Sequence, residues 1–199
     1  MEEIMNLPNK LTLIRIIMIP LFIILLSCDI NMGTVIWLGT SIQVTRIVAA
    51  IVFAAACITD FLDGQIARRQ HLVTNFGKFA DPLADKMIVM SAFIILVSFG
   101  LVPAWVAAVI VCRELAVTGL RLIVVENDGQ VIAAAWPGKI KTFSQMIAII
   151  LLLLNDFLFI PFTTIGFGTL LLYICLFFTV YSGVEYFWKS RFIFSDSFK

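Results

Sequence analysis

Residues 60–68 read DFLDGQIAR, and after eight further residues positions 77–86 read GKFADPLADK. Both segments lie at the edges of long apolar runs, where a charged group is costly because little water can solvate it. They nevertheless contain four aspartates, Asp60, Asp63, Asp81 and Asp85. The fold and the chemistry of the chain must both accommodate these four acids.

The spacing of the aspartates predicts a pair of helices. Residues three or four apart are neighbours on a helix surface, so the two acids of each segment share one helix face. The polar segment 69–76 between the two segments predicts a turn. We therefore expect an antiparallel helix pair in which the aspartates of one helix face those of the other.

Four carboxylates in a site of low dielectric repel one another and cannot all stay ionised without cations. Ligand sets made only of carboxylates favour hard divalent ions such as Mg²⁺ or Mn²⁺ over zinc. Two such ions close together are typical of phosphoryl chemistry. Small residues on the same faces, Gly64, Ala67 and Gly77, would let a bulky ligand approach the backbone, and Arg68 could pair with a phosphate. The alternative is a set of helix-end acids solvated at a membrane surface.

The composition is typical of a membrane protein. Hydrophobic residues make up 61% of the 199 residues and charged residues only 14%, and the mean hydropathy is +1.05. These values exclude an ordinary soluble domain. The net charge of +1 by itself says nothing about partners. For a membrane protein of this kind we expect no nucleic-acid partner.

Six apolar runs, each near the roughly 20 residues that cross a bilayer, predict an all-α polytopic membrane protein. The runs are about 11–27, 46–67, 78–99, 104–125, 142–158 and 164–188. A short interfacial segment precedes the first run. We expect residues 1–199 to form a single catalytic domain of six transmembrane helices.

The basic residues predict the orientation of these spans. Most fall at the ends and loops of one side, and Arg46 is the only basic residue near a loop of the opposite side. The positive-inside rule then places both termini and the active site on the cytoplasmic side of a cell membrane.

Charged residues inside the runs lie at a common depth. Asp60, Asp85 and Arg113 are each about 10–12 Å along a helix from a basic residue at its cytoplasmic end. Intramembrane charges at one level indicate a polar cavity. We expect it to open to the cytoplasm, with runs 46–67, 78–99 and 104–125 as its walls.

A second polar group follows the aspartates and consists of Arg113, Thr118, Arg121, Lys139 and Lys141. Buried arginines without a nearby acid favour an anionic ligand, and guanidinium groups suit phosphate. The alternatives are that Glu114 neutralises Arg113 or Lys86, and that the two lysines are ordinary basic flanks. Together these residues favour a phosphorylated acceptor over a neutral one.

The pattern Asp60-x2-Asp63-Gly64-x2-Ala67-Arg68-x8-Gly77-x3-Asp81-x3-Asp85 resembles the signature of the CDP-alcohol phosphatidyltransferases, with every position filled. The resemblance implies an integral membrane enzyme that displaces CMP from a CDP-linked lipid or alcohol. It also implies two divalent metal ions held by the four aspartates, and a homodimer.

Further motifs at residues 8–15, 113–121 and 138–142 resemble the bacterial branch of the family that makes phosphatidylglycerophosphate. This resemblance implies CDP-diacylglycerol as donor and sn-glycerol 3-phosphate as acceptor, among membrane lipids. Phosphatidylglycerol, serine or an inositol phosphate are alternative acceptors. A transporter is the alternative from another class, although the acids cluster towards one side and no repeated halves are visible.

Roles for individual residues follow as hypotheses. One metal ion would bind Asp60, Asp63 and Asp81, and the other Asp60, Asp81 and Asp85. Asp81 and Asp85 would be catalytic, with Asp85 as the base. CDP-diacylglycerol would contact Thr12, Gly64, Ala67, Arg68 and Gly77. The acceptor would contact Arg113, Thr118, Arg121, Lys139 and Lys141.

Overall fold

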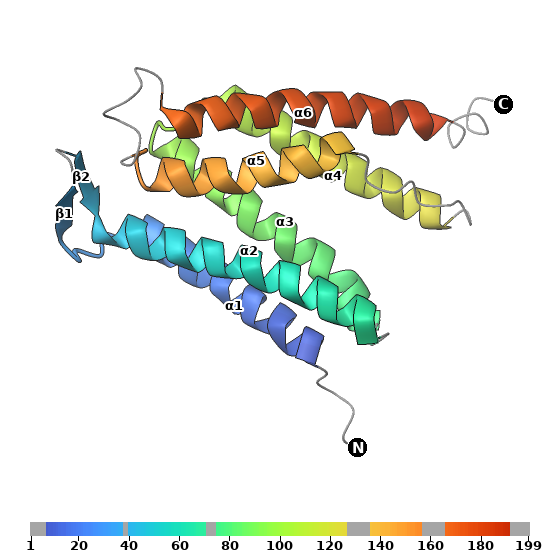
Figure 1. Ribbon diagram of the computed structural model, residues 1–199, viewed down its shortest axis with the longest axis horizontal. Helices are drawn as coiled ribbons and strands as arrows, with labels where there is room; N and C mark the ends of the chain where they lie inside the picture. Colours follow the sequence, from blue (N-terminus) through green and yellow to red (C-terminus); the bar gives the residue numbers. More distant parts are fainter. Residues whose placement is uncertain (1–6, 38–39, 71–74, 127–135, 157–165, 192–199) are drawn as a thin grey trace.

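The computed structural model describes residues 7–37, 40–70, 75–126, 136–156 and 166–191 (Figure 1). Within these ranges, side chains are described except at 7–11, 37, 40, 61–70, 75–82, 122, 125 and 126. The helices are α1 (Leu7–Ser27), α2 (Val44–Gln70), α3 (Asn75–Ser98), α4 (Ala104–Glu126), α5 (Trp136–Leu153) and α6 (Phe167–Lys189). The strands β1 (Thr34–Trp37) and β2 (Thr40–Gln43) form an antiparallel hairpin between α1 and α2.

The helices form two groups joined by α3. Helix α1 packs against α2 and α3, while α6 packs against α5 and α4. Helix α3 crosses between the groups and contacts both α4 and α5 (Figure 1). Helix α1 begins, α2 ends and α3 begins at one end of the bundle, and the hairpin lies at the other. The aspartate-containing segments of α2 and α3 therefore lie at the end where α1 begins.

The expected succession of helices is confirmed among the described residues, including the antiparallel relation of α2 and α3. The purely α prediction is wrong for residues 34–37 and 40–43, which form the two strands of the hairpin. The first strand, Thr-Val-Ile-Trp, is rich in the β-branched and aromatic residues that favour strands.

The predicted bounds of the fifth helix, 142–158, are also wrong, because α5 begins at Trp136 and ends at Leu153. Pro137 is tolerated in its first turn, where a missing N–H costs no helical hydrogen bond. The helix stops where Asn155 and Asp156 adopt left-handed φ angles of 57° and 53°. Short polar side chains tolerate this conformation better than most residues do.

A buried carboxylate joins the end of α5 to the start of α6. The N–H group of Gly168 donates a hydrogen bond to Asp156 Oδ1 at 2.7 Å. A β-carbon at Gly168 would lie only 2.8 Å from that oxygen, so a larger residue at this position would force the Asp156 carboxylate to shift. Burial raises the pKa of Asp156, and the hydrogen bond from Gly168 opposes that rise. The contact ties the end of α5 to the start of α6, and the two helices run antiparallel (Figure 1).

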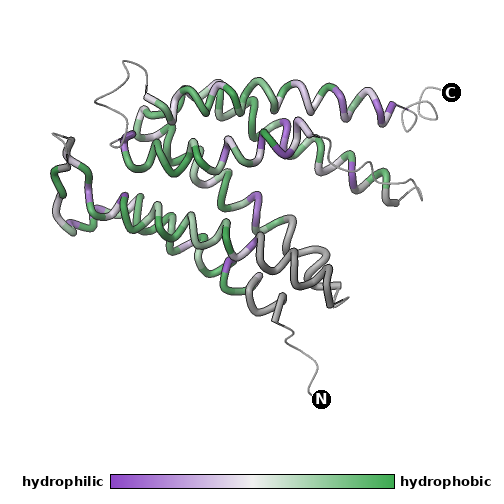
Figure 2. The backbone as a smooth tube through the Cα atoms, viewed as in Figure 1, coloured by the Kyte–Doolittle hydropathy of each residue, from purple (hydrophilic) through white to green (hydrophobic). Residues whose placement is uncertain are grey.

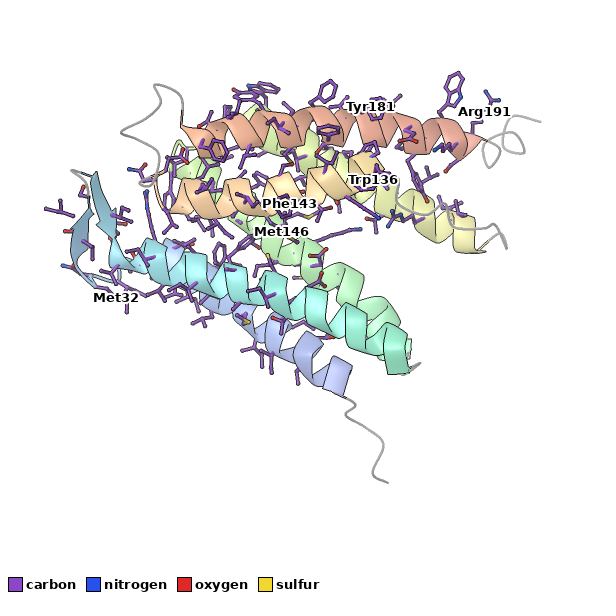
Figure 3. The ribbon with its side chains drawn as sticks, in the orientation of Figure 1. Met32, Trp136, Phe143, Met146, Tyr181 and Arg191 are labelled. Atoms are coloured by element: carbon purple, nitrogen blue, oxygen red, sulfur yellow. The ribbon has the colours of Figure 1, made fainter. Side chains whose placement is uncertain are left out.

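The outer surface is apolar on several helices. Exposed side chains include Ile17 on α1, Ile94 on α3 and Val184 on α6. Tyr181 on α6 is also exposed (Figure 3). Figure 2 shows long hydrophobic stretches interrupted by hydrophilic residues near the middle and ends of the bundle. Among the described residues, Phe167–Lys189 is the one helix that by length and composition is able to cross a membrane, and Thr12–Ser27 is a shorter apolar helix. The arrangement of six spans stays a prediction.

Candidate functional site

Helix α1 contributes a buried cation to the aspartate region. Thr12 and Arg15 lie three residues apart on one face of α1, and both are fully buried. Arg15 Nη1 lies 2.8 Å from Asp60 Oδ1 on α2. Arg15 was not among the predicted site residues. It lies inside an apolar run, where an arginine needs an acidic partner, and this position could have indicated its role.

Two of the four aspartates have described side chains. Asp60 on α2 and Asp85 on α3 are both half-buried, and they are close enough to repel each other electrostatically. Arg15 attracts Asp85 as well as Asp60. The helix pair thus brings an acid from each segment into one electrostatic environment, as the spacing predicted.

The remaining predicted residues of this region belong to α2 and α3, but their side chains lie outside the described residues: Asp63, Gly64, Ala67, Arg68, Gly77 and Asp81. Among the side chains that are described, no group of three or more acidic, histidine or cysteine residues could hold a metal ion. The predicted metal-ligand set and the CDP contacts therefore stay predictions.

A cavity of about 210 Å³ lies beside Asp85, between α3, α4 and α5. Its charged lining residues are Asp85, Lys86, Arg113, Glu114, Arg121 and Lys141. Among the side chains that the structure describes, four basic groups thus face two acidic groups, which leaves an excess of positive charge. None of the described side chains of run 46–67 lines this cavity, so that wall stays a prediction. Helix α5, which was not predicted as a wall, lines the cavity together with α3 and α4.

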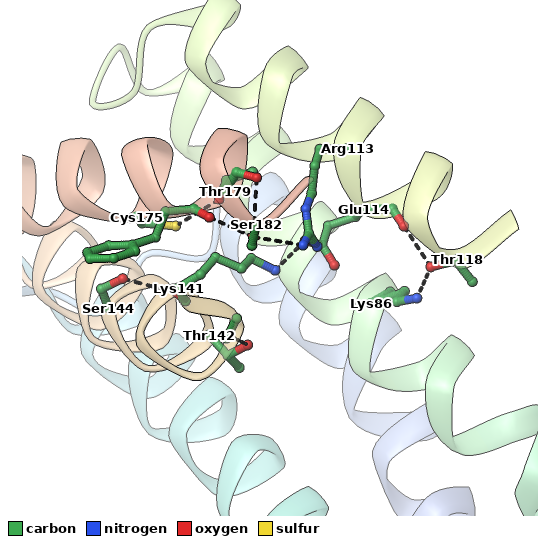
Figure 4. Close-up of polar contacts among 12 residues, drawn as sticks. Lys86, Arg113, Glu114, Thr118, Lys141, Thr142, Ser144, Cys175, Thr179 and Ser182 are labelled. Atoms are coloured by element: carbon green, nitrogen blue, oxygen red, sulfur yellow. Dashed lines mark hydrogen bonds and ion pairs between the residues drawn. The ribbon is translucent and has the colours of Figure 1, made fainter. Parts of the chain in front are cut away.

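Glu114 connects two of the basic groups. Its Oε1 atom accepts hydrogen bonds from Arg113 Nη1 at 3.1 Å and from Lys141 Nζ (Figure 4). Lys141 and Glu114 are both largely buried, with side chains 7% and 12% exposed. The alternative that Glu114 neutralises Arg113 is therefore confirmed, and Lys141 shares the same carboxylate. One acid serving two cations leaves part of their positive charge for a ligand.

Thr118 links α4 to α3. Its hydroxyl donates to the Glu114 carbonyl oxygen at 2.6 Å and accepts a hydrogen bond from Lys86 Nζ (Figure 4). The hydroxyl is therefore already engaged on both sides. Its main effect is to hold the Lys86 ammonium group at the cavity.

Helix α6 positions Arg113. Arg113 Nη2 donates a hydrogen bond to Ser182 Oγ at 2.8 Å. A β-carbon at the neighbouring Gly183 would lie 3.1 Å from Arg113 Cγ, so glycine lets the arginine stem lie against α6. Neither residue was predicted to belong to the site, since nothing in the apolar sequence of α6 indicates which helix it contacts.

The two remaining basic residues of the predicted acceptor group differ in position. The Arg121 guanidinium lies 5.5 Å from the centre of the Tyr186 ring and lines the cavity. Lys139 is exposed, with its ammonium group 5.3 Å from the centre of the Trp136 ring, and it does not line the cavity. The structure thus brings together Arg113, Thr118, Arg121 and Lys141, and it leaves Lys139 outside.

Comparison with known proteins gives a consistent family assignment. A profile of the CDP-alcohol phosphatidyltransferase family matches residues 5–181. The chain is 50% identical to a CDP-diacylglycerol--glycerol-3-phosphate 3-phosphatidyltransferase of Bacillus subtilis (strain 168), over 93% of this chain and 95% of the relative. Proteins of the same name are 37% identical in Rickettsia typhi, over 92% and 95% of the two lengths, and 32% identical in Escherichia coli (strain K12), over 94% and 95%.

The shared carboxylate of Glu114 generates a prediction about stability. Glu114→Gln should lower the thermal midpoint in detergent, because Lys141 would lose its charged partner in a buried site. Lys141→Met alone should also lower it, whereas the double variant should lose less than the sum of the two. We expect a coupling free energy of about 1–3 kcal/mol from the double-mutant cycle. Additive losses would contradict a direct Glu114–Lys141 interaction.

Proposed function

Because this chain belongs to the CDP-alcohol phosphatidyltransferase family, we propose that it transfers the phosphatidyl group of CDP-diacylglycerol to sn-glycerol 3-phosphate. The products are phosphatidylglycerophosphate and CMP. The names of the relatives supply the donor and the acceptor. The observation that carries the proposal is the cavity beside Asp85 with its excess of positive charge, which suits a small phosphorylated alcohol.

The acceptor phosphate would bind to Arg113, Arg121 and Lys141. All three line the cavity, and guanidinium groups offer paired donors that match phosphate oxygens. Arg113 is oriented in advance by Ser182 and Glu114, so little side-chain order remains to be imposed when the ligand binds. The exposed position of Lys139 favours a role at the membrane surface instead.

The four aspartates would hold two Mg²⁺ or Mn²⁺ ions, with Asp60, Asp63 and Asp81 at one and Asp60, Asp81 and Asp85 at the other. The donor set fits such ions, since Asp60 and Asp85 repel each other and an all-carboxylate set suits hard cations. When bound, the ions would supply charge neutralisation for the diphosphate and the CMP leaving group.

The side chains of the protein would bind the donor and move one proton. Thr12, which lies three residues before Arg15 on α1, would contact the CDP group together with Gly64, Ala67, Arg68 and Gly77. The acceptor hydroxyl oxygen forms a bond to the phosphatidyl phosphorus while the bond from that phosphorus to CMP breaks. Asp85, which lines the acceptor cavity, takes the hydroxyl proton.

The site would work at the cytoplasmic face of a cell membrane. Six spans with both termini cytoplasmic agree with the apolar outer surface and with the positions of the basic residues. Helices α2 and α4 end, and α3 begins, at the end where the termini of the bundle lie (Figure 1). Family resemblance also favours a homodimer, which cross-linking in native membranes can test.

Asp81→Asn should abolish CMP release, because an amide cannot replace the charge of a carboxylate that holds divalent ions. The assay uses purified protein with CDP-diacylglycerol, sn-glycerol 3-phosphate and Mg²⁺, and EDTA should have the same effect as the substitution. Asp156→Asn is the control and should keep ordinary turnover. Asp156 lies between α5 and α6, and the asparagine keeps an oxygen that can accept the hydrogen bond from the Gly168 N–H group. Ordinary turnover in the Asp81 variant would overturn the metal assignment.

Arg121→Ala should chiefly raise the KM for sn-glycerol 3-phosphate, by about tenfold or more, because it removes a charged phosphate contact. Arg191→Ala is a matched control. The Arg191 guanidinium also lies over an aromatic ring, 5.1 Å from the centre of the Trp188 ring, but Arg191 does not line the cavity. If the two variants have equal KM values for sn-glycerol 3-phosphate, Arg121 does not bind the acceptor.

A further inference from the structure

Gln145 on α5 has a buried donor with no assigned task. Its side chain lines the cavity beside Asp85, and the residue is only 2% exposed. The Nε2 atom is buried and has no hydrogen-bond partner among the described residues. A buried amide donor without a partner costs free energy, so a native fold retains one where a ligand or water satisfies it.

The position of Gln145 along the cavity separates it from the phosphate-binding cations. Gln145 lies one helical turn after Lys141, or about 6 Å further along α5. Apolar residues, among them Phe93 and Ile110, line the cavity as well. Gln145 therefore offers a neutral, directional donor in a cavity whose other polar groups are mostly charged.

We propose that Gln145 Nε2 donates a hydrogen bond to the C2 hydroxyl of the acceptor and so selects a phosphorylated polyol. This inference rests on the proposed function. In sn-glycerol 3-phosphate, the C2 hydroxyl lies between the phosphate, which Lys141 and the arginines attract, and the C1 hydroxyl, which must reach Asp85. An amide one turn from Lys141 on α5, lining the same cavity as Asp85 on α3, is suited to that central hydroxyl.

The binding of this hydroxyl predicts a specific kind of discrimination. When an analogue without the hydroxyl binds, the buried donor of the protein is left without a partner, so the site disfavours this analogue. If the protein donor is removed instead, the kcat/KM values for the analogue and for the natural acceptor become more nearly equal. Gln145 thus acts as a specificity-determining residue, and a purely structural glutamine would not change the ratio between the two acceptors.

The test compares sn-glycerol 3-phosphate with 3-hydroxypropyl phosphate, which lacks the C2 hydroxyl, in CMP-release assays on the full-length enzyme. We expect the wild type to prefer sn-glycerol 3-phosphate by about tenfold or more in kcat/KM. Gln145→Met, which keeps the length but removes the donor, should reduce this preference to about threefold or less. If the Met variant does not fold, Gln145→Leu provides the same comparison.

Ile149→Val is the control for packing, since Ile149 is fully buried one turn further along α5. It should keep the wild-type preference. An unchanged preference in the Gln145 variant, or an equal loss with both acceptors, would overturn the inference while leaving the proposed function intact. A wild-type enzyme that releases no CMP with sn-glycerol 3-phosphate would overturn the proposed function, and the inference with it.

Discussion

Charged side chains between apolar helices must find partners, because little water is present to solvate them. In the part of this protein that the structure describes, several such partnerships join two different helices. Arg15 joins α1 to Asp60 on α2, and Lys141 joins α5 to Glu114 on α4. The hydrogen bonds from Arg113 to Ser182 and from Lys86 to Thr118 connect α4 to α6 and to α3. Ion pairs and hydrogen bonds thus hold together the walls around the cavity.

The same contacts leave the cavity positively charged. Glu114 is shared by two cations, and the hydroxyls of Ser182 and Thr118 hold cations without neutralising them. The arrangement keeps Arg113 and Lys86 in place while preserving their charge for an anionic ligand. A neutral acceptor would leave these charges uncompensated, which is why the geometry favours a phosphorylated one.

The sequence was sufficient to predict the succession of helices and several of the residues that line the cavity. Long apolar runs predict helices, and the i, i+3 and i+4 spacing of the aspartates predicts a shared face whatever the surroundings. Four of the five predicted acceptor residues line one cavity. Lys139 is the exception because it lies two residues from Lys141 and so points to a different side of α5.

Contacts between helices that are distant in the sequence could not be predicted from the sequence. Arg15, Ser182 and Gly183 acquire their roles only when α1 packs on α2 and α6 packs on α4. Local patterns do not encode these pairings, and almost every helix of this chain is apolar on most sides. The wall formed by α5 was missed for the same reason. Gln145 was missed because a single glutamine in an apolar run has no spacing pattern to indicate a ligand.

The most direct test of the central claim measures CMP release by the purified wild-type protein with CDP-diacylglycerol and Mg²⁺ while only the acceptor is varied. The acceptors are sn-glycerol 3-phosphate, serine, inositol 1-phosphate and phosphatidylglycerol. The charge of the cavity and the family assignment predict release with sn-glycerol 3-phosphate and not with the other three. Release with serine or phosphatidylglycerol instead would contradict the assignment of Arg113, Arg121 and Lys141 to an acceptor phosphate.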